Sequence, residues 1–131
     1  MSELRVLAPT AILGYGFPIQ SFEEGLKRDP HVIAVDAGSS DPGPFYLGAG
    51  VSFTDRNAVK RDLELMLTAA RKRKLPLIIG GAGGSGGEPH LKWNVEIVEE
   101  IAKEKNLAFK MAVIHAEISP KLVLDKLALG K

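Results

Sequence analysis

Three residues that follow apolar runs are the strongest candidates for chemistry in this sequence. His115 and Glu117 follow the run 109–114, and their two-residue spacing places both side chains on one face of an extended segment. Asp36 directly follows the run 32–35. The set permits three roles: acid-base work by His115 oriented by Glu117, a divalent metal held by all three residues, or structural hydrogen bonding. For Asp36, an Asx-type turn to its own backbone is a further alternative.

A glycine-rich stretch, residues 80–87, has the composition of a ligand-binding loop. It reads Gly-Gly-Ala-Gly-Gly-Ser-Gly-Gly and lies between an apolar run and a helical pattern. Without Cβ atoms the backbone N–H groups of such a loop can approach a ligand, and the next helix N-terminus favours a phosphate or carboxylate. The formal G-x-G-x-x-G match follows the third apolar run instead of the first, which disfavours a dinucleotide. We expect an anion-binding loop, with a flexible crossover as the alternative.

Two further loops follow apolar runs and supply candidate ligand contacts. Residues 10–16 form a short Gly-containing loop, and residues 36–54 form a loop long enough to be functional, with apolar residues to order it. The complete set of predicted anion or substrate contacts is Thr10, Gly14, Ser39, Ser40, Asp41, Gly81, Gly83, Gly84, Ser85, Gly86 and His90. His31, at the beginning of an apolar run, is expected to be structural.

The elements that position these residues form an alternating pattern of strands and helices. Apolar runs at 5–8, 32–35, 75–79 and 109–114 are rich in Val and Ile and are separated by helical patterns, which is the βαβ signature. The runs lack strict alternation, so helices are expected on both faces of a mainly parallel sheet. The sequence therefore predicts a three-layer α/β domain with four strands in the order 2-1-3-4, flavodoxin-like or Rossmann-like. Ligands bind such folds at the carboxyl ends of the strands.

Four helices have recognisable start signals in the sequence. Ser21 and Glu24 form a capping box that predicts a helix over about 22–28. The second begins after Thr54 or Asp55, and the last begins at Ser119-Pro120 and ends near Gly130. The core side of the second helix is predicted from the apolar stripe Val59, Leu63, Met66 and Ala70.

The third helix is predicted to begin near Pro89. Its apolar stripe consists of Leu91, Val95, Val98 and Ala102. With that side in the core, Trp93 and Ile97 point away from it and form either a contact surface or an ordinary partly exposed patch.

Composition restricts the classes of partner. The 131 residues include 45% hydrophobic and 25% charged residues, which fits one folded domain. The net charge of +1 provides no field to attract nucleic acid or an anionic membrane, and the basic run 71–74 lies at a helix C-terminus where cations are favourable. The absence of cysteine excludes disulfides and thiolate chemistry. With no secretory signal or long apolar span in the sequence, we expect a cytoplasmic location.

The stretches 7–16, 35–44 and 113–117 resemble the amino-terminal region of the acyclic terpene utilisation A-like family. Because members of that family are much longer, the resemblance implies an N-terminal domain or fragment. It also implies an enzyme of branched, terpene-derived acid catabolism, acting on acyl-CoA thioesters whose phosphates suit an anion-binding loop. It assigns no catalytic residue, reaction class, cofactor or metal. The alternative is a non-catalytic assembly domain that packs against a missing domain or a second subunit, as in a homo-oligomer.

Overall fold

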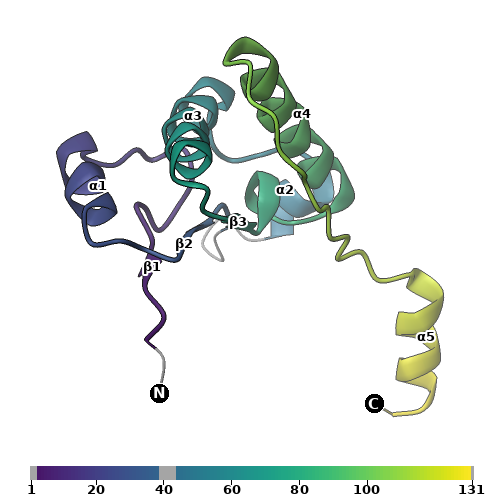
Figure 1. The fold of residues 1–131 in the computed structure, drawn as a ribbon. Coiled ribbons are helices and arrows are strands. Elements are labelled where there is room, and N and C mark those ends of the chain that lie inside the picture. The colour runs from purple at the N-terminus through teal and green to yellow at the C-terminus, as the bar shows by residue number, and fades with distance from the viewer. Residues whose placement is uncertain (1–2, 39–43, 131) are drawn as a thin grey trace.

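The computed structural model describes residues 3–38 and 44–130, and within them shows an α/β fold with three parallel strands and five α-helices (Figure 1). The strands are β1 (Val6–Leu7), β2 (Val32–Asp36) and β3 (Leu77–Gly80). The helices are α1 (Ile19–Leu26), α2 (Pro44–Ala49), α3 (Arg56–Arg73), α4 (Glu88–Glu104) and α5 (Pro120–Ala128), with a short 3-10 helix η1 at Ala82–Gly84. The predicted α/β class is confirmed.

The sheet differs from the prediction in strand order. Among the described residues its order is β1-β2-β3, so β2 is the central strand, with Ile33 opposite both Leu7 and Leu77. The predicted order, with the first strand between the second and third, is wrong. Residues 109–114 are extended but form no ladder with the described strands, so a fourth strand is not confirmed.

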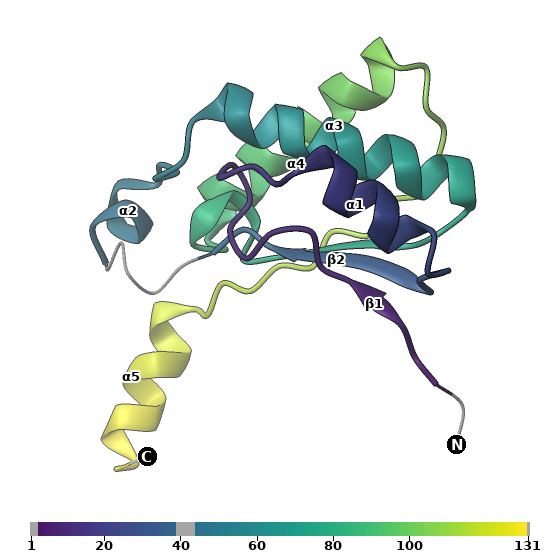
Figure 2. The same cartoon turned by 90° about the vertical axis from the view of Figure 1, so that its left-hand side faces the viewer.

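The layers follow from this strand order. A right-handed crossover places its helix on a fixed side of the sheet, so two successive crossovers in the same direction place α1 and α3 on the same face. Figure 2 shows α1, α3 and α4 together on one side of the sheet. Within the described part of the chain no helix covers the opposite face, so the described fold has two layers where three were predicted.

The core lies between this helical layer and the sheet. Alternate strand residues, including Leu7, Ile33, Val35 and Ile79, pack in or against it. The intervening residues face the uncovered side, where Val6 is 54% and Ile78 57% exposed.

Local signals predicted α3 and α5 well. The Asp55 side chain accepts hydrogen bonds from the N–H groups of Asn57 and Ala58, and the predicted stripe of α3 is buried. The Ser119 side chain accepts from Leu122 N–H and begins α5. The capping box at Ser21 is wrong, because α1 already begins at Ile19 and has no side-chain cap.

The predicted core face of α4 is also wrong. The helix begins at Glu88, close to the predicted start, but its buried residues are His90, Asn94, Ile97, Val98 and Ile101. Ile97 is fully buried and Trp93 packs against the core, so these two residues form no exposed contact surface. The stripe was misplaced because two of its members are polar, and a search for apolar periodicity passes over them.

Order in the long second loop is provided by α2. Ser39, Ser40 and Asp41 lie outside the described residues.

Over residues 3–38 and 44–130, no helix is both long enough and apolar enough to cross a membrane.

Candidate anion-binding site at the glycine-rich loop

Asp36 lies at the carboxyl end of β2, where it contacts the glycine-rich loop. It is opposite Gly80 in the ladder, and its Oδ1 accepts a hydrogen bond from Gly38 N–H at 2.8 Å. This is the Asx-type turn given above as an alternative for Asp36. A Cβ on Gly81 would lie 2.8 Å from Asp36 Oδ1 and 2.7 Å from Gly38 N, so only glycine allows this approach. Asp36 therefore packs against the glycine-rich loop, and its side chain is exposed at this edge of the sheet.

The loop at residues 10–16 reaches the same edge. Leu13 N–H donates to the carbonyl oxygen of Asp36 at 3.0 Å, as expected for loops that follow parallel strands. Thr10 Oγ1 is engaged locally, at 3.0 Å from Ile12 O and 3.3 Å from Ile12 N. The predicted juxtaposition of the first and second loops is thus present.

Asp62, on α3, holds this first loop in place. Its carboxylate is 1% exposed, and Oδ2 accepts hydrogen bonds from the N–H groups of Gly14 and Gly16, each at 2.9 Å. Sequence reasoning missed this residue. A signal was available, because Asp62 occupies the i+3 position after Val59 within the buried stripe of α3, where an unpaired carboxylate would be costly.

The glycine-rich loop is a packed turn. Its predicted contacts Gly81, Gly83, Gly84 and Gly86 all have positive φ, and the N–H of Gly84 donates to Gly81 O at 2.9 Å. A Cβ on Gly83 would lie 2.2 Å from His90 O, so the loop backbone packs directly on α4. Gly83 and Gly84 are buried, whereas Ser85, Gly86 and Gly87 are partly exposed. Gly80 and Gly81, at the end of β3, are exposed as well, so two parts of the loop are open, and Ser85–Gly87 is the part next to the N-terminus of α4.

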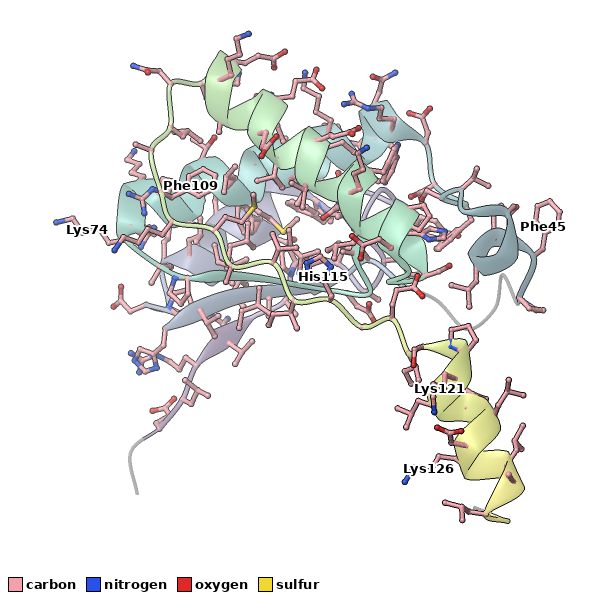
Figure 3. The ribbon with its side chains drawn as sticks, turned by 90° about the vertical axis from the view of Figure 1, so that its right-hand side faces the viewer. Phe45, Lys74, Phe109, His115, Lys121 and Lys126 are labelled. Carbon is pink, nitrogen blue, oxygen red and sulfur yellow. The ribbon has the colours of Figure 1, made fainter. Side chains whose placement is uncertain are left out.

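A carboxylate already occupies that N-terminus. The N-cap residue Gly87 has no side chain, and instead Glu117 Oε1 accepts a hydrogen bond from Glu88 N–H at 2.9 Å. His115 Nδ1 lies 2.8 Å from Glu88 Oε2. His115 projects from the extended segment between α4 and α5 (Figure 3).

His115 and Glu117 thus converge, as their spacing predicted, but on Glu88. Among the described residues no hydrogen bond joins Asp36 to either of them, and no three His, Asp or Glu side chains are grouped as a metal site requires. The metal alternative for these three residues therefore finds no support in this arrangement.

His90 lies beneath the loop. It is 1% exposed, and its Nε2 is 3.0 Å from the carbonyl oxygens of both Tyr46 and Val51, so Nε2 is the protonated nitrogen. Through these bonds His90 ties α2 and the segment after it to α4. Its buried Nδ1 has no hydrogen-bond partner among the described residues and lies 3.3 Å from the position of a Cβ on Gly87. An unpaired polar atom therefore adjoins the exposed end of the loop.

A groove of about 780 Å³ lies elsewhere, between β1 and α1, and is lined in part by Val6, Gly25 and Arg28. It contains none of the predicted ligand contacts. We place the candidate site at Ser85–Glu88 and not at this groove, because the hydrogen bond to the α4 N-terminus and the unpaired Nδ1 of His90 lie there. Comparison of the chain with models of protein families, with curated proteins and with solved structures found no match.

Proposed function

We propose that this chain is the substrate-binding domain of a metabolic enzyme, and that residues Ser85–Glu88 bind the anionic group of a small molecule. The observation that carries the proposal is the hydrogen bond from Glu88 N–H to the Glu117 carboxylate. Free N–H groups and the dipole at a helix N-terminus favour negative charge, and here the chain supplies that charge itself. A ligand phosphate or carboxylate would replace Glu117 at the same N–H.

The neighbouring groups support a ligand of mixed character. The unpaired Nδ1 of His90 lies buried beneath Gly87, and it can accept a hydrogen bond from a ligand hydroxyl or amide if Gly87 shifts on binding, while its Nε2 donates to the α2 segment. An acyl-CoA of a branched or terpene-derived acid combines phosphates, amides and hydroxyls. The resemblance of residues 7–16, 35–44 and 113–117 to the acyclic terpene utilisation A-like family makes this ligand class our specific proposal.

Removing the internal carboxylate tests the site. In Glu117→Ala, affinity for coenzyme A thioesters and for inorganic phosphate should rise roughly tenfold, because the tethered competitor is gone. Trp93 on α4 is the single tryptophan of the chain, so its fluorescence provides a readout beside calorimetry. The control is Glu99→Ala, which removes an exposed carboxylate from α4 away from its N-terminus and should leave affinity unchanged.

Adding a carboxylate at the cap should have the opposite effect. In Gly87→Asp, Asp is a favoured N-cap residue, and its Cβ would lie 3.1 Å from the end of the Leu47 side chain, which must shift slightly. The added charge repels an anion, so affinity should fall at least about tenfold. Circular dichroism checks the fold of this variant. If neither the native chain nor Glu117→Ala binds phosphate or a CoA thioester at millimolar concentration, the proposed function is wrong.

An assembly role is the second candidate function. It is favoured by the apolar side chains that the chain leaves exposed, among them Val6, Ile78 and most of the apolar residues of α5. Surface of this kind on a folded protein usually marks an interaction site.

A further inference from the structure

One face of the sheet is uncovered and apolar. Val6 on β1 and Ile78 on β3 are each more than half exposed and alternate with the core residues Leu7 and Ile79, so they face away from the core. The helices α1, α3 and α4 all lie on the other side of the sheet (Figure 2). Leu4, which precedes β1, is 70% exposed. Parallel sheets are almost always covered on both faces, because crossover helices usually pack on each face and the strands are apolar on both sides. The described helices supply only half of this cover.

The helix α5 is the matching surface. It has no buried residue, and the chain from 110 to 130 is exposed throughout. Val123, Leu124 and Leu127 have the i, i+1, i+4 spacing that places them on one side of the helix. Lys121 and Asp125 form an ion pair at 2.6 Å on another side. The helix is therefore amphipathic, and no residue on its apolar side is buried by the described part of the chain.

The exposed area of the chain is too large for a compact monomer. A folded monomer of 14.1 kDa has about 6,700 Å² of accessible surface. This chain has 8733 Å², so the excess is about 2,000 Å². A standard stable interface buries about 800 Å² per partner. The uncovered surface is thus sufficient for a stable dimer.

We propose that two copies of this chain exchange their C-terminal segments, so that α5 of each copy packs its apolar side on the uncovered sheet face of the other. The contact is isologous, as in most homodimers, and covers both apolar surfaces at once. It also supplies the second helical layer that a parallel sheet requires. The inference shares the Glu117 contact with the proposed ligand site, but it concerns the chain without ligand, and a monomeric chain would leave the ligand proposal intact.

The exchange between copies follows from how the segment is held. Glu117 is bound to the N-terminus of α4, while Ser119 caps α5 and Pro120 fixes its first turn. Only Ile118 lies between these two constraints, so α5 has little freedom to turn back under its own sheet. Figures 1 and 2 show α5 projecting beyond the globule, on the side away from α1, α3 and α4. In this position α5 is accessible to the sheet face of a second copy.

Light scattering of the full chain after size-exclusion chromatography tests the dimer. The native chain should have twice the monomer mass at micromolar concentration. Leu127→Glu should raise the dimer dissociation constant on the order of 100-fold, because it removes a buried leucine and buries a charge. Leu122→Glu is the matched control, because it makes the same change on the other side of α5 and should leave the mass unchanged.

Cysteine cross-linking distinguishes exchange between copies from folding within one copy. The native chain has no cysteine, so introduced thiols report without background. Mixing Ile78→Cys chains with Leu127→Cys chains should give a disulfide-linked product of two chain masses, and replacing the second by Leu122→Cys should give little. A monomeric native chain, or a cross-link formed only within one chain carrying both cysteines, would overturn the proposal.

Discussion

At the scale of single residues, the carboxylate of Asp62 organises the loop that approaches Asp36. Asp62→Ala would leave the partly buried N–H groups of Gly14 and Gly16 without their acceptor. A fully buried donor left unsatisfied costs about 1–3 kcal/mol, so for two partly buried donors we expect a loss of about 2 kcal/mol in the free energy of unfolding. Urea denaturation measures the loss. Asp125→Ala on the exposed helix α5 should change stability by less than about 0.5 kcal/mol, and equal effects of the two changes would contradict this role.

Gly83 gives a second prediction at this scale. Its φ is 74° and an added Cβ would lie 2.2 Å from His90 O, so Gly83→Ala requires both a strained backbone and displacement of α4. The cost should be about 3 kcal/mol, from the left-handed conformation and overpacking together. Gly48→Ala is the matched control. It lies in α2 with open space around it, and alanine there should raise stability by about 0.5 kcal/mol. Thermal melts of both variants provide the comparison.

At the scale of elements, α3 and α4 are joined by an ion-pair network. Glu100 accepts from Lys60 Nζ and Arg56 Nη2, both at 2.6 Å, and Lys60 also donates to Glu104 at 2.8 Å. The hydrogen bonds from Lys60 and then Arg56 lower the pKa of Glu100 below its ordinary value of 4.5. Those to Glu100 and Glu104 raise the pKa of Lys60 above 10.5.

These pKa shifts predict a pH dependence of stability. Because the pKa of Glu100 is lowered by folding, its stabilising effect is present above pH 4.5 and is lost as the pH falls through the folded pKa. For Lys60 the effect is present below pH 10.5 and is lost at higher pH. Glu100→Gln should therefore flatten the decline of Tm in acid, and Glu99→Gln on the same helix should not. An unchanged acid limb in Glu100→Gln would exclude the network as its cause.

The same elements show what the sequence could and could not predict. The start of α3 and its buried stripe were predictable, because the Asp55 cap and the apolar spacing that begins at Val59 depend only on residues nearby in the sequence. Strand order was not, because whether β3 pairs with β1 or β2 depends on packing between distant segments. The face of α4 was mispredicted because His90 is buried through hydrogen bonds to the carbonyls of α2 and its neighbour, a partnership that no local pattern encodes.

The candidate site was predictable to a similar degree. The meeting of the 10–16 loop, Asp36 and the glycine-rich loop follows from parallel strands ending at one edge. The contacts of His115 and Glu117 with Glu88 do not follow from the strand arrangement. Their alternation placed them on one face, but only the path of the segment after α4 directs that face to Glu88.

At the scale of the whole molecule, the exchanged dimer predicts a pattern of amide hydrogen exchange. In the Leu127→Glu monomer, amides of α5 should exchange almost as fast as those of the extended segment before it, because an isolated helix of 9 residues is marginally stable. In the native chain α5 should exchange at least about tenfold more slowly, while β2 is equally protected in both. Equal exchange of α5 in the two proteins would contradict the dimer.

The order β1-β2-β3 has a consequence for how the chain acquires its structure during synthesis. Each strand pairs with the one made just before it, so the contacts that build the sheet join neighbouring segments of the chain. Each pairing still spans 26 residues (Val6 to Val32) or 44 residues (Ile33 to Leu77), so loop-closure entropy opposes both steps, and less strongly the first. We therefore expect β1, α1 and β2 to associate while α4 is still being translated, with each later unit added to a growing edge.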